Sequence, residues 1–205
     1  MKGLFAYISI TTAMIFGFVV VALLFLATDI DPMRFGISFY ALTRYGFIIG
    51  AALALVGISG IFLAFGLWPT IFSAAGRIGL ALLIVWGVTS ILAGIFPLDA
   101  PGAVPTFSGS IHNMAGLNFL LIVPAVLLIE LHRSSRIEPA QSQPITHWLG
   151  WLVLVSTILL FTFNGPLASI GVGGFIQRLY WLVVTLWILF KAQHILRVER
   201  KDSIP

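Results

Sequence analysis

Few residues in this chain have side chains that could carry out chemistry, and two of them lie close together in the sequence. Asp99 follows Phe96-Pro97-Leu98, and His112 lies one short loop further on. A carboxylate beside a histidine is the minimum for general acid–base chemistry. We therefore expect Asp99 and His112 to form a pair. The alternative is that Asp99 caps backbone groups or pairs with an arginine, while His112 lies at the membrane interface.

Arg178 is the second residue of interest, because it falls inside an apolar stretch. Only the 12 uncharged residues 179–190 separate it from Lys191, about 18 Å of helix at about 1.5 Å per residue. The hydrocarbon core of a membrane is about 30 Å thick. We expect Lys191 to extend to the nearer surface. Arg178 should face protein and pair with Asp29, Asp31 or Asp99, or clamp a carboxylate or phosphate group, for which its planar fork is suited.

Four further polar residues are expected at the same end of the molecule. Arg44 and Tyr45 precede one apolar stretch, Asn164 ends another, and Gln177 adjoins Arg178. Our leading hypothesis is a polar pocket that binds a small amphiphile or lipid head group. Arg178 would take the anionic part and the Asp99–His112 pair the polar part, with the four further residues at the edge.

Two other function classes remain open. In the first, a membrane-embedded hydrolase, Asp99 orients His112 as a catalytic general base, and the nucleophile is a serine (Ser38, Ser108 or Ser110) or water. In the second, the protein is a structural or assembly subunit held by small-residue helix faces such as Gly46-x-x-x-Gly50.

No metal or cofactor is expected from these residues. The chain has no cysteine, and this end of it offers one histidine, whereas a catalytic zinc site needs about three protein ligands. The remaining histidines, His132, His147 and His194, fall near the opposite helix ends and are interpreted as interfacial. No nucleotide-binding or nucleophile-elbow motif is present.

The composition identifies the kind of protein that must position these residues. Of the 205 residues, 60% are apolar and 9% are charged, against about 25% charged in a soluble domain; the mean hydropathy is +1.08. A water-soluble globule is excluded. The net charge of +4 rests on too few residues to make a nucleic-acid surface. The expected partners are membrane lipids and a small anionic or amphiphilic ligand, and an oligomer is possible.

The apolar runs predict an all-α membrane protein, a polytopic bundle of six transmembrane helices. A helix needs about 20 mostly apolar residues to cross the hydrocarbon, and the runs are interrupted by charged, proline or glycine residues. The expected helices cover about residues 4–27, 46–67, 78–98, 111–130, 148–164 and 172–196 of a single transmembrane domain, 1–205. Ser108 or Ser110 is expected to cap the fourth helix, with His112 in its first turn.

The cations predict the orientation. Three of them (Arg34, Arg44 and Arg178) fall on one side of the expected bundle, and the other eight fall on the opposite side: Lys2, Arg77, Arg133, Arg136, Lys191, Arg197, Arg200 and Lys201. Because positive residues gather on the cytoplasmic side, both termini are expected in the cytoplasm. The localisation predicted is a prokaryotic plasma membrane.

Several of these residues also carry a resemblance to a known family. The pattern Phe96-Pro97-x-Asp99 is followed by Gly109-x-x-His112, while Tyr45-Gly46 opens the second expected helix and Gln177-Arg178 the sixth. Together these residues resemble an uncharacterised prokaryotic membrane family catalogued as domain of unknown function nine-nine-eight. The resemblance covers nearly the whole chain and implies a six-helix bundle. It implies no activity. Gln177 stands where that family often has an acidic residue, which weakens any mechanism that needs two acids.

Overall fold

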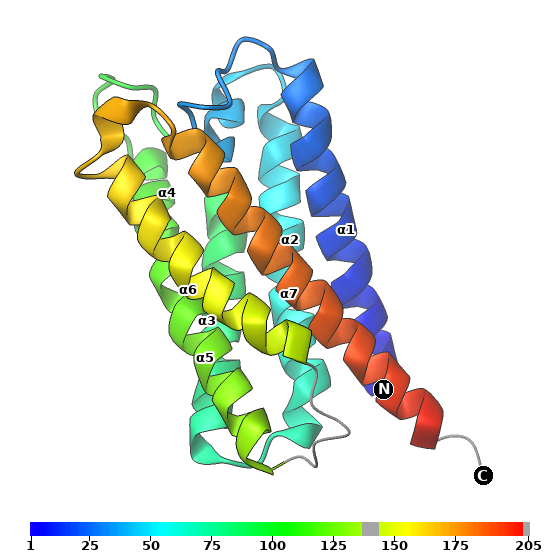
Figure 1. Cartoon of the computed structure of the whole chain (residues 1–205). Coiled ribbons are helices and arrows are strands. Elements are labelled where there is room, and N and C mark those ends of the chain that lie inside the picture. Colours follow the sequence, from blue (N-terminus) through cyan, green and yellow to red (C-terminus); the bar gives the residue numbers. More distant parts are fainter. Residues whose placement is uncertain (137–143, 203–205) are drawn as a thin grey trace.

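The computed structural model describes residues 1–136 and 144–202, and of residues 132–136 and 201–202 it describes the backbone alone. These ranges form helices joined by turns (Figure 1). In chain order the elements are α1 (Lys2–Leu26), η1 (Ile37–Leu42), α2 (Gly46–Leu67), η2 (Trp68–Thr70), α3 (Ala74–Ile95), α4 (Phe107–Gly116), α5 (Asn118–Arg136), α6 (Pro144–Asn164), η4 (Ala168–Ile170) and α7 (Gly173–Asp202).

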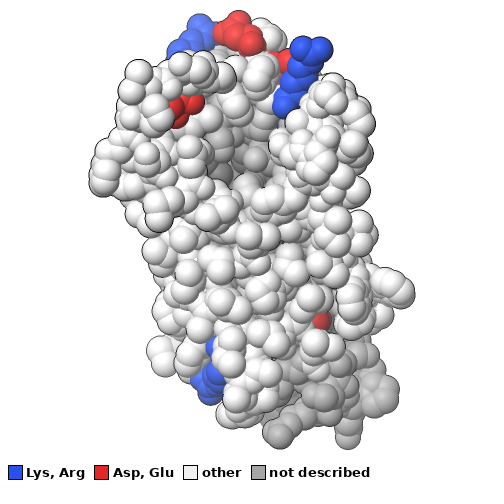
Figure 2. Space-filling model, turned by 90° about the vertical axis from the view of Figure 1, so that its left-hand side faces the viewer, with Lys and Arg blue, Asp and Glu red and all other residues white. Residues whose placement is uncertain are grey.

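Six segments of this structure are long and apolar enough to cross a membrane, as expected for a multi-pass membrane protein. They are Lys2–Leu26, Gly46–Thr70, Ala74–Ile95, Phe107–Leu131, Pro144–Asn164 and Gly173–Arg200. On the face shown in Figure 2, the charged side chains lie toward the two ends and leave a broad uncharged band between them. We call the end with the loops 27–45, 96–106 and 165–172 the Asp99 end, and the opposite end the terminal end.

The start of α1 and the end of α7 lie at the terminal end (Figure 1). The amino group of Met1 is 3.9 Å from a carboxylate oxygen of Glu199. Which end faces the cytoplasm stays a prediction.

The third helix ends earlier than the sequence suggested. Ser73 caps its start by accepting a hydrogen bond from the Gly76 amide at 3.1 Å. The helix stops at Ile95 and not at residue 98, because Pro97 cannot continue a helix. Phe96 is extended, and residues 97–100 have no regular secondary structure.

The fourth span consists of two helices, α4 and α5, with Leu117 between them. It begins at Phe107, capped by Thr106, whose hydroxyl oxygen accepts from the Gly109 amide at 3.0 Å. The expectation that Ser108 or Ser110 forms the cap was wrong. Thr106 takes that position because the helix starts four residues earlier than the apolar run, and His112 consequently lies in the second turn.

Helices α2 and α3 touch through their backbones at two levels. The pairs are Gly50 with Gly94 and Gly57 with Gly87, so that a Cβ added to Gly50 would lie 2.6 Å from the Gly94 carbonyl oxygen. One added to Gly87 would lie 2.5 Å from the Gly57 carbonyl oxygen. Small residues permit this approach in a membrane, where packing takes over much of the role of the hydrophobic effect.

We expect Gly57→Ala to lower stability by about 1–3 kcal/mol, because the new methyl group forces the two backbones apart. Gly17→Ala is the matched control, since nothing lies within 4 Å of a Cβ at Gly17; it should be neutral or up to about 1 kcal/mol stabilising. Unfolding in a mixed detergent titration measures both. Equal stability of the two variants would contradict the backbone contact.

Helices α5 and α7 are joined by a buried ion pair. The ammonium of Lys191 lies 2.6 Å from a carboxylate oxygen of Glu130, and the Trp187 indole donates to the same oxygen at 2.8 Å. Thr146 of α6 donates to the other oxygen at 3.5 Å. The Lys191 side chain is 2% exposed, so the expectation that it extends to the surface was wrong.

Two of the three opposite-end histidines have described side chains. His194 is buried, one turn beyond Lys191. His147 accepts a hydrogen bond from the Trp151 indole at 3.2 Å on the exposed side of α6. The His132 side chain lies outside the described residues.

Removing one member of the ion pair should destabilise the fold far more than removing both. Lys191→Met leaves the Glu130 carboxylate buried without its counter-ion, and we expect a loss of about 3–5 kcal/mol. Glu130→Gln combined with Lys191→Met keeps an acceptor for Trp187 and should recover more than half of that loss. Unfolding of the two variants in one detergent measures the difference. A double variant no more stable than Lys191→Met would show that the unpaired Glu130 carboxylate is not the cause of the lost stability.

Candidate functional site

Asp99 binds Thr106, the residue at the other end of the loop that joins α3 to α4. Its carboxylate accepts hydrogen bonds from the amide of Thr106 at 2.9 Å and from the hydroxyl of Thr106 at 2.7 Å, and it packs against Gly109, where a Cβ would overlap it. These hydrogen bonds favour the ionised form and lower the pKa of the Asp99 carboxyl below its usual value. Asp99 is therefore an anion at neutral pH, and it caps backbone groups at the start of α4.

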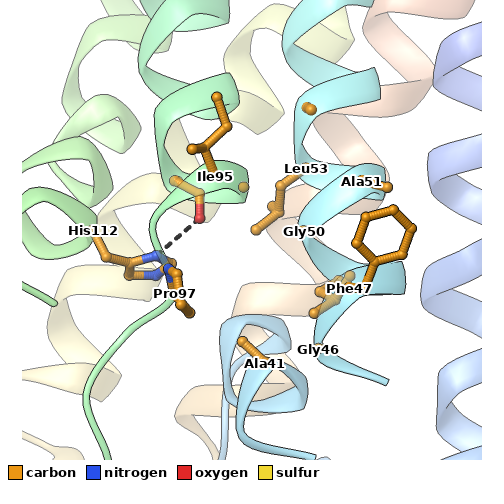
Figure 3. A pocket seen from close by; sticks show the side chains of 13 residues that line it. Ala41, Gly46, Phe47, Gly50, Ala51, Leu53, Ile95, Pro97 and His112 are labelled. Carbon is orange, nitrogen blue, oxygen red and sulfur yellow. Dashed lines mark hydrogen bonds between the residues drawn. The ribbon is translucent and has the colours of Figure 1, made fainter. Parts of the chain in front are cut away.

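His112 is held by helix α3 and not by Asp99. Its ring is 8% exposed, and Nδ1 lies 3.0 Å from the Ala93 carbonyl oxygen and 2.8 Å from that of Phe96; Figure 3 shows the first contact. Carbonyl oxygens only accept, so Nδ1 carries the proton and donates. In the neutral ring Nε2 is then a hydrogen-bond acceptor. The expected Asp99–His112 pair does not form, because the carbonyl groups at the end of α3 hold the ring.

Arg178 is also held by backbone carbonyl groups. Its Nη1 donates to the carbonyl oxygens of Pro32 at 2.7 Å, Phe35 at 2.8 Å and Gly174 at 2.9 Å. Its Nη2 donates to the Tyr40 hydroxyl at 2.9 Å, and the guanidinium lies 5.4 Å from the centre of that ring. In the described part of the chain no carboxylate lies within 4 Å of it. The predicted acidic partner is replaced by these oxygens.

Gln177 attaches the same loop to α7. Its side-chain oxygen accepts from the Ile37 amide at 2.7 Å, and the Phe175 amide donates to the Met33 carbonyl at 3.1 Å. Together with Arg178 it fixes residues 32–40 on the start of α7. Both residues thus position a loop between α1 and α2, which is a structural role.

The remaining predicted residues lie in separate groups. Asn164 donates to the carbonyl oxygens of Leu160 at 2.9 Å and Gly173 at 3.4 Å, which ties the end of α6 to the start of α7. Arg44 donates to the Tyr45 hydroxyl at 2.7 Å and lies over that ring, 4.9 Å from its centre. The Arg44–Tyr45 pair is at the surface, directly before α2. The residues expected to form one pocket are thus divided among several hydrogen-bonded groups.

A groove that sequence reasoning missed lies beside His112. It has a volume of about 500 Å³ and lies between the Asp99-end halves of α2 and α3, with η1 at one side (Figure 3). Glycine and alanine at facing positions of both helices were the only signal for it in the sequence. Its walls are Ala41, Gly46, Phe47, Ile49, Gly50, Ala51, Leu53, Ala54, Ala93, Gly94, Ile95, Pro97 and His112.

The role of Arg178 can be tested by Arg178→Lys. A lysine keeps the charge but cannot reach several carbonyl groups and Tyr40 at once, so we expect a loss of about 2–4 kcal/mol and faster amide exchange in residues 33–40. Arg34→Lys is the control, because Arg34 is exposed and makes only a 3.7 Å contact with Asp31. Unchanged hydrogen exchange in the loop of the Arg178 variant would overturn the structural role and favour an anion clamp.

The comparisons with known proteins agree with the family resemblance noted in the sequence. No curated protein and no solved structure matches the chain. A family model described as protein of unknown function (DUF998) matches residues 10–194, a range that includes Asp99, His112 and Arg178. Because the match covers most of the 205 residues, the chain belongs to the DUF998 family.

Proposed function

We propose that this membrane protein binds a single-chain amphiphile in the groove between α2 and α3. The observation that carries the proposal is an apolar groove in which His112 is the only side chain with a polar atom. The ligand's tail would lie along the groove and its head would reach Nε2 of His112.

The walls of the groove suit an alkyl chain. Its volume of about 500 Å³ falls within the range of about 300–1,000 Å³ usual for ligand pockets. Phe47 is 88% exposed and Ile95 is 60% exposed, so the rim of the groove faces the surroundings of the bundle. An amphiphile dissolved in the membrane would reach it from the side, without passing through the loops.

The chemistry of His112 selects the head group. With Nδ1 donating to the carbonyl oxygens of α3, Nε2 accepts, and the best partner is a hydroxyl or an ammonium group. Arg44 and Tyr45 stand directly before Gly46 of the groove wall and would take an anionic part of a larger head. Arg44 therefore replaces Arg178 as the cation of the proposed site.

Binding is better supported than hydrolysis. The groove walls contain no hydroxyl or carboxylate, so a hydrolase would have to use water as nucleophile with His112 alone as base. Ser108 donates to the Pro97 carbonyl at 2.9 Å and Ser110 to that of Thr106 at 2.8 Å. A purely structural subunit would have no use for the groove.

The charge distribution supports a location for the site. With Lys191 paired to Glu130, seven of the eight expected cations remain at the terminal end, against three at the Asp99 end. By the positive-inside rule the termini would be cytoplasmic. The groove would then face the outer leaflet of a prokaryotic plasma membrane.

The proposal predicts selective stabilisation by matched amphiphiles. We expect a fatty alcohol or fatty amine to raise the melting temperature of the protein in nanodiscs more than a fatty acid of the same chain length. His112→Asn should abolish the preference, because the amide can still donate to the α3 carbonyl groups but presents no acceptor at the Nε2 position. A melting series with the three amphiphiles measures this.

A second pair of variants tests the groove itself. Ala51→Phe fills it from an exposed position and should remove the response to every amphiphile. Ala81→Phe, at an exposed position of α3 outside the groove, should respond like the unchanged protein. If Ala51→Phe and Ala81→Phe respond alike, or no amphiphile changes the melting temperature, the groove is not a binding site.

A further inference from the structure

The middle of the bundle holds a group of buried polar atoms that have no partner at full hydrogen-bond geometry. Two of them face each other, because the Trp86 indole is directed at the Tyr180 hydroxyl. Among the described residues six such side-chain atoms occur, and one of them, Nε of Arg178, belongs to the loop contact already described. The other five lie on α3, α5 and α7: Trp86 Nε1, Asn118 Oδ1, Tyr180 Oη, Trp181 Nε1 and Thr185 Oγ1. Each of these side chains is more than nine-tenths buried.

Ring contacts bring most of these side chains together. Trp181 is the centre: its ring lies 6.2 Å from Trp86 and 5.3 Å from Tyr180. Phe119, the neighbour of Asn118, lies 4.8 Å from Tyr180 and 5.8 Å from Trp181. Thr185 follows Trp181 by one turn of α7. We call the five residues Trp86, Asn118, Tyr180, Trp181 and Thr185 the Trp181 cluster.

The hydrogen bonds around Asn118 show which of its atoms is left over. Ser90 donates its hydroxyl to the Trp86 carbonyl at 2.9 Å, so its oxygen accepts from Nδ2 of Asn118, also at 2.9 Å. The amide orientation is thereby fixed, and Oδ1 remains as an acceptor. With the Trp86 indole directed at the Tyr180 hydroxyl, the Trp181 cluster offers the Trp181 indole as a donor, the Asn118 amide oxygen as an acceptor and two hydroxyl groups that can do either.

Charged groups do not complete this set. Arg178 is committed to the carbonyl oxygens of residues 32–35 and Gly174. Glu130 stands on the same face of α5 as Asn118, but Ile122 and Val126, both fully buried, lie between them. An occupant of the Trp181 cluster would therefore meet neutral groups, which disfavours an ion.

We propose that the Trp181 cluster is an internal binding site for a neutral oxygen that both accepts and donates hydrogen bonds. Its occupant is either ordered water or the hydroxyl group of a small uncharged molecule. Polar groups buried in an apolar interior are normally satisfied, and internal water serves this purpose where two to four polar partners converge. The site is distinct from the groove, because no residue of the Trp181 cluster lines the groove.

The sign of a stability change tests the proposal. Thr185→Val removes a hydroxyl that has no partner within the described chain, with little change of shape. If an occupant binds there, the variant should lower the melting temperature by about 3 °C or more. If the hydroxyl is dry and unpaired, removing it should leave the melting temperature unchanged or raise it, and the proposal fails. Thr157→Val, whose hydroxyl donates to the Val153 carbonyl of its own helix, gives the baseline for the exchange.

Radiolytic hydroxyl-radical labelling distinguishes the two sources of the oxygen. Bound water should make Trp86 and Trp181 at least several-fold more reactive than Trp187, which is equally buried but donates to Glu130. If the indoles are as protected as Trp187, native mass spectrometry should show a retained neutral molecule that is lost in Tyr180→Phe. Protected indoles together with no retained molecule would overturn the proposal.

Discussion

The structure depends on one constraint: a polar group inside an apolar bundle has to find its partner within the same chain. Glu130 and Lys191 show the constraint most clearly. Their 2.6 Å contact joins α5 to α7, and hydrogen bonds from Trp187 and Thr146 complete the carboxylate and add α6. Moving either charge alone into the hydrocarbon is costly, so the pair restricts how these three helices can be arranged.

The same constraint decides what the polar residues at the Asp99 end can do. Arg178 and His112 both donate to backbone carbonyl groups that helix ends and loops leave unpaired. Asp99 does the converse and accepts from Thr106. Once these needs are met, few polar groups remain for a ligand, and His112 is the one lining residue of the groove whose side chain has a polar atom. A residue type suited to chemistry is thus poor evidence of a site until its structural partners are counted.

The sequence predicted those features that depend on a single segment of the chain. Apolar runs predicted the six spans, and the family suggested by resemblance is the one whose model matches residues 10–194. Contacts between side chains of different helices were harder to predict from the sequence. The Lys191 side chain has the same local sequence whether it extends to the surface or pairs with Glu130, and the choice depends on how α5 packs against α7. The groove was harder still to predict, since it is the space left where glycine and alanine have no large side chain to fill it.

The close approach of α2 and α3 and the groove beside it have one physical origin. Gly50 and Gly94 bring the two backbones into contact, and the same residues line the groove. Small residues that permit contact on one side of the helix pair leave unfilled space on the other. His112 of α4 lines this space. After the break at Leu117, Asn118 begins α5 and donates a hydrogen bond to Ser90 of α3. Helix α3 therefore contributes residues both to the groove, through Ala93, Gly94 and Ile95, and to the Trp181 cluster, through Trp86.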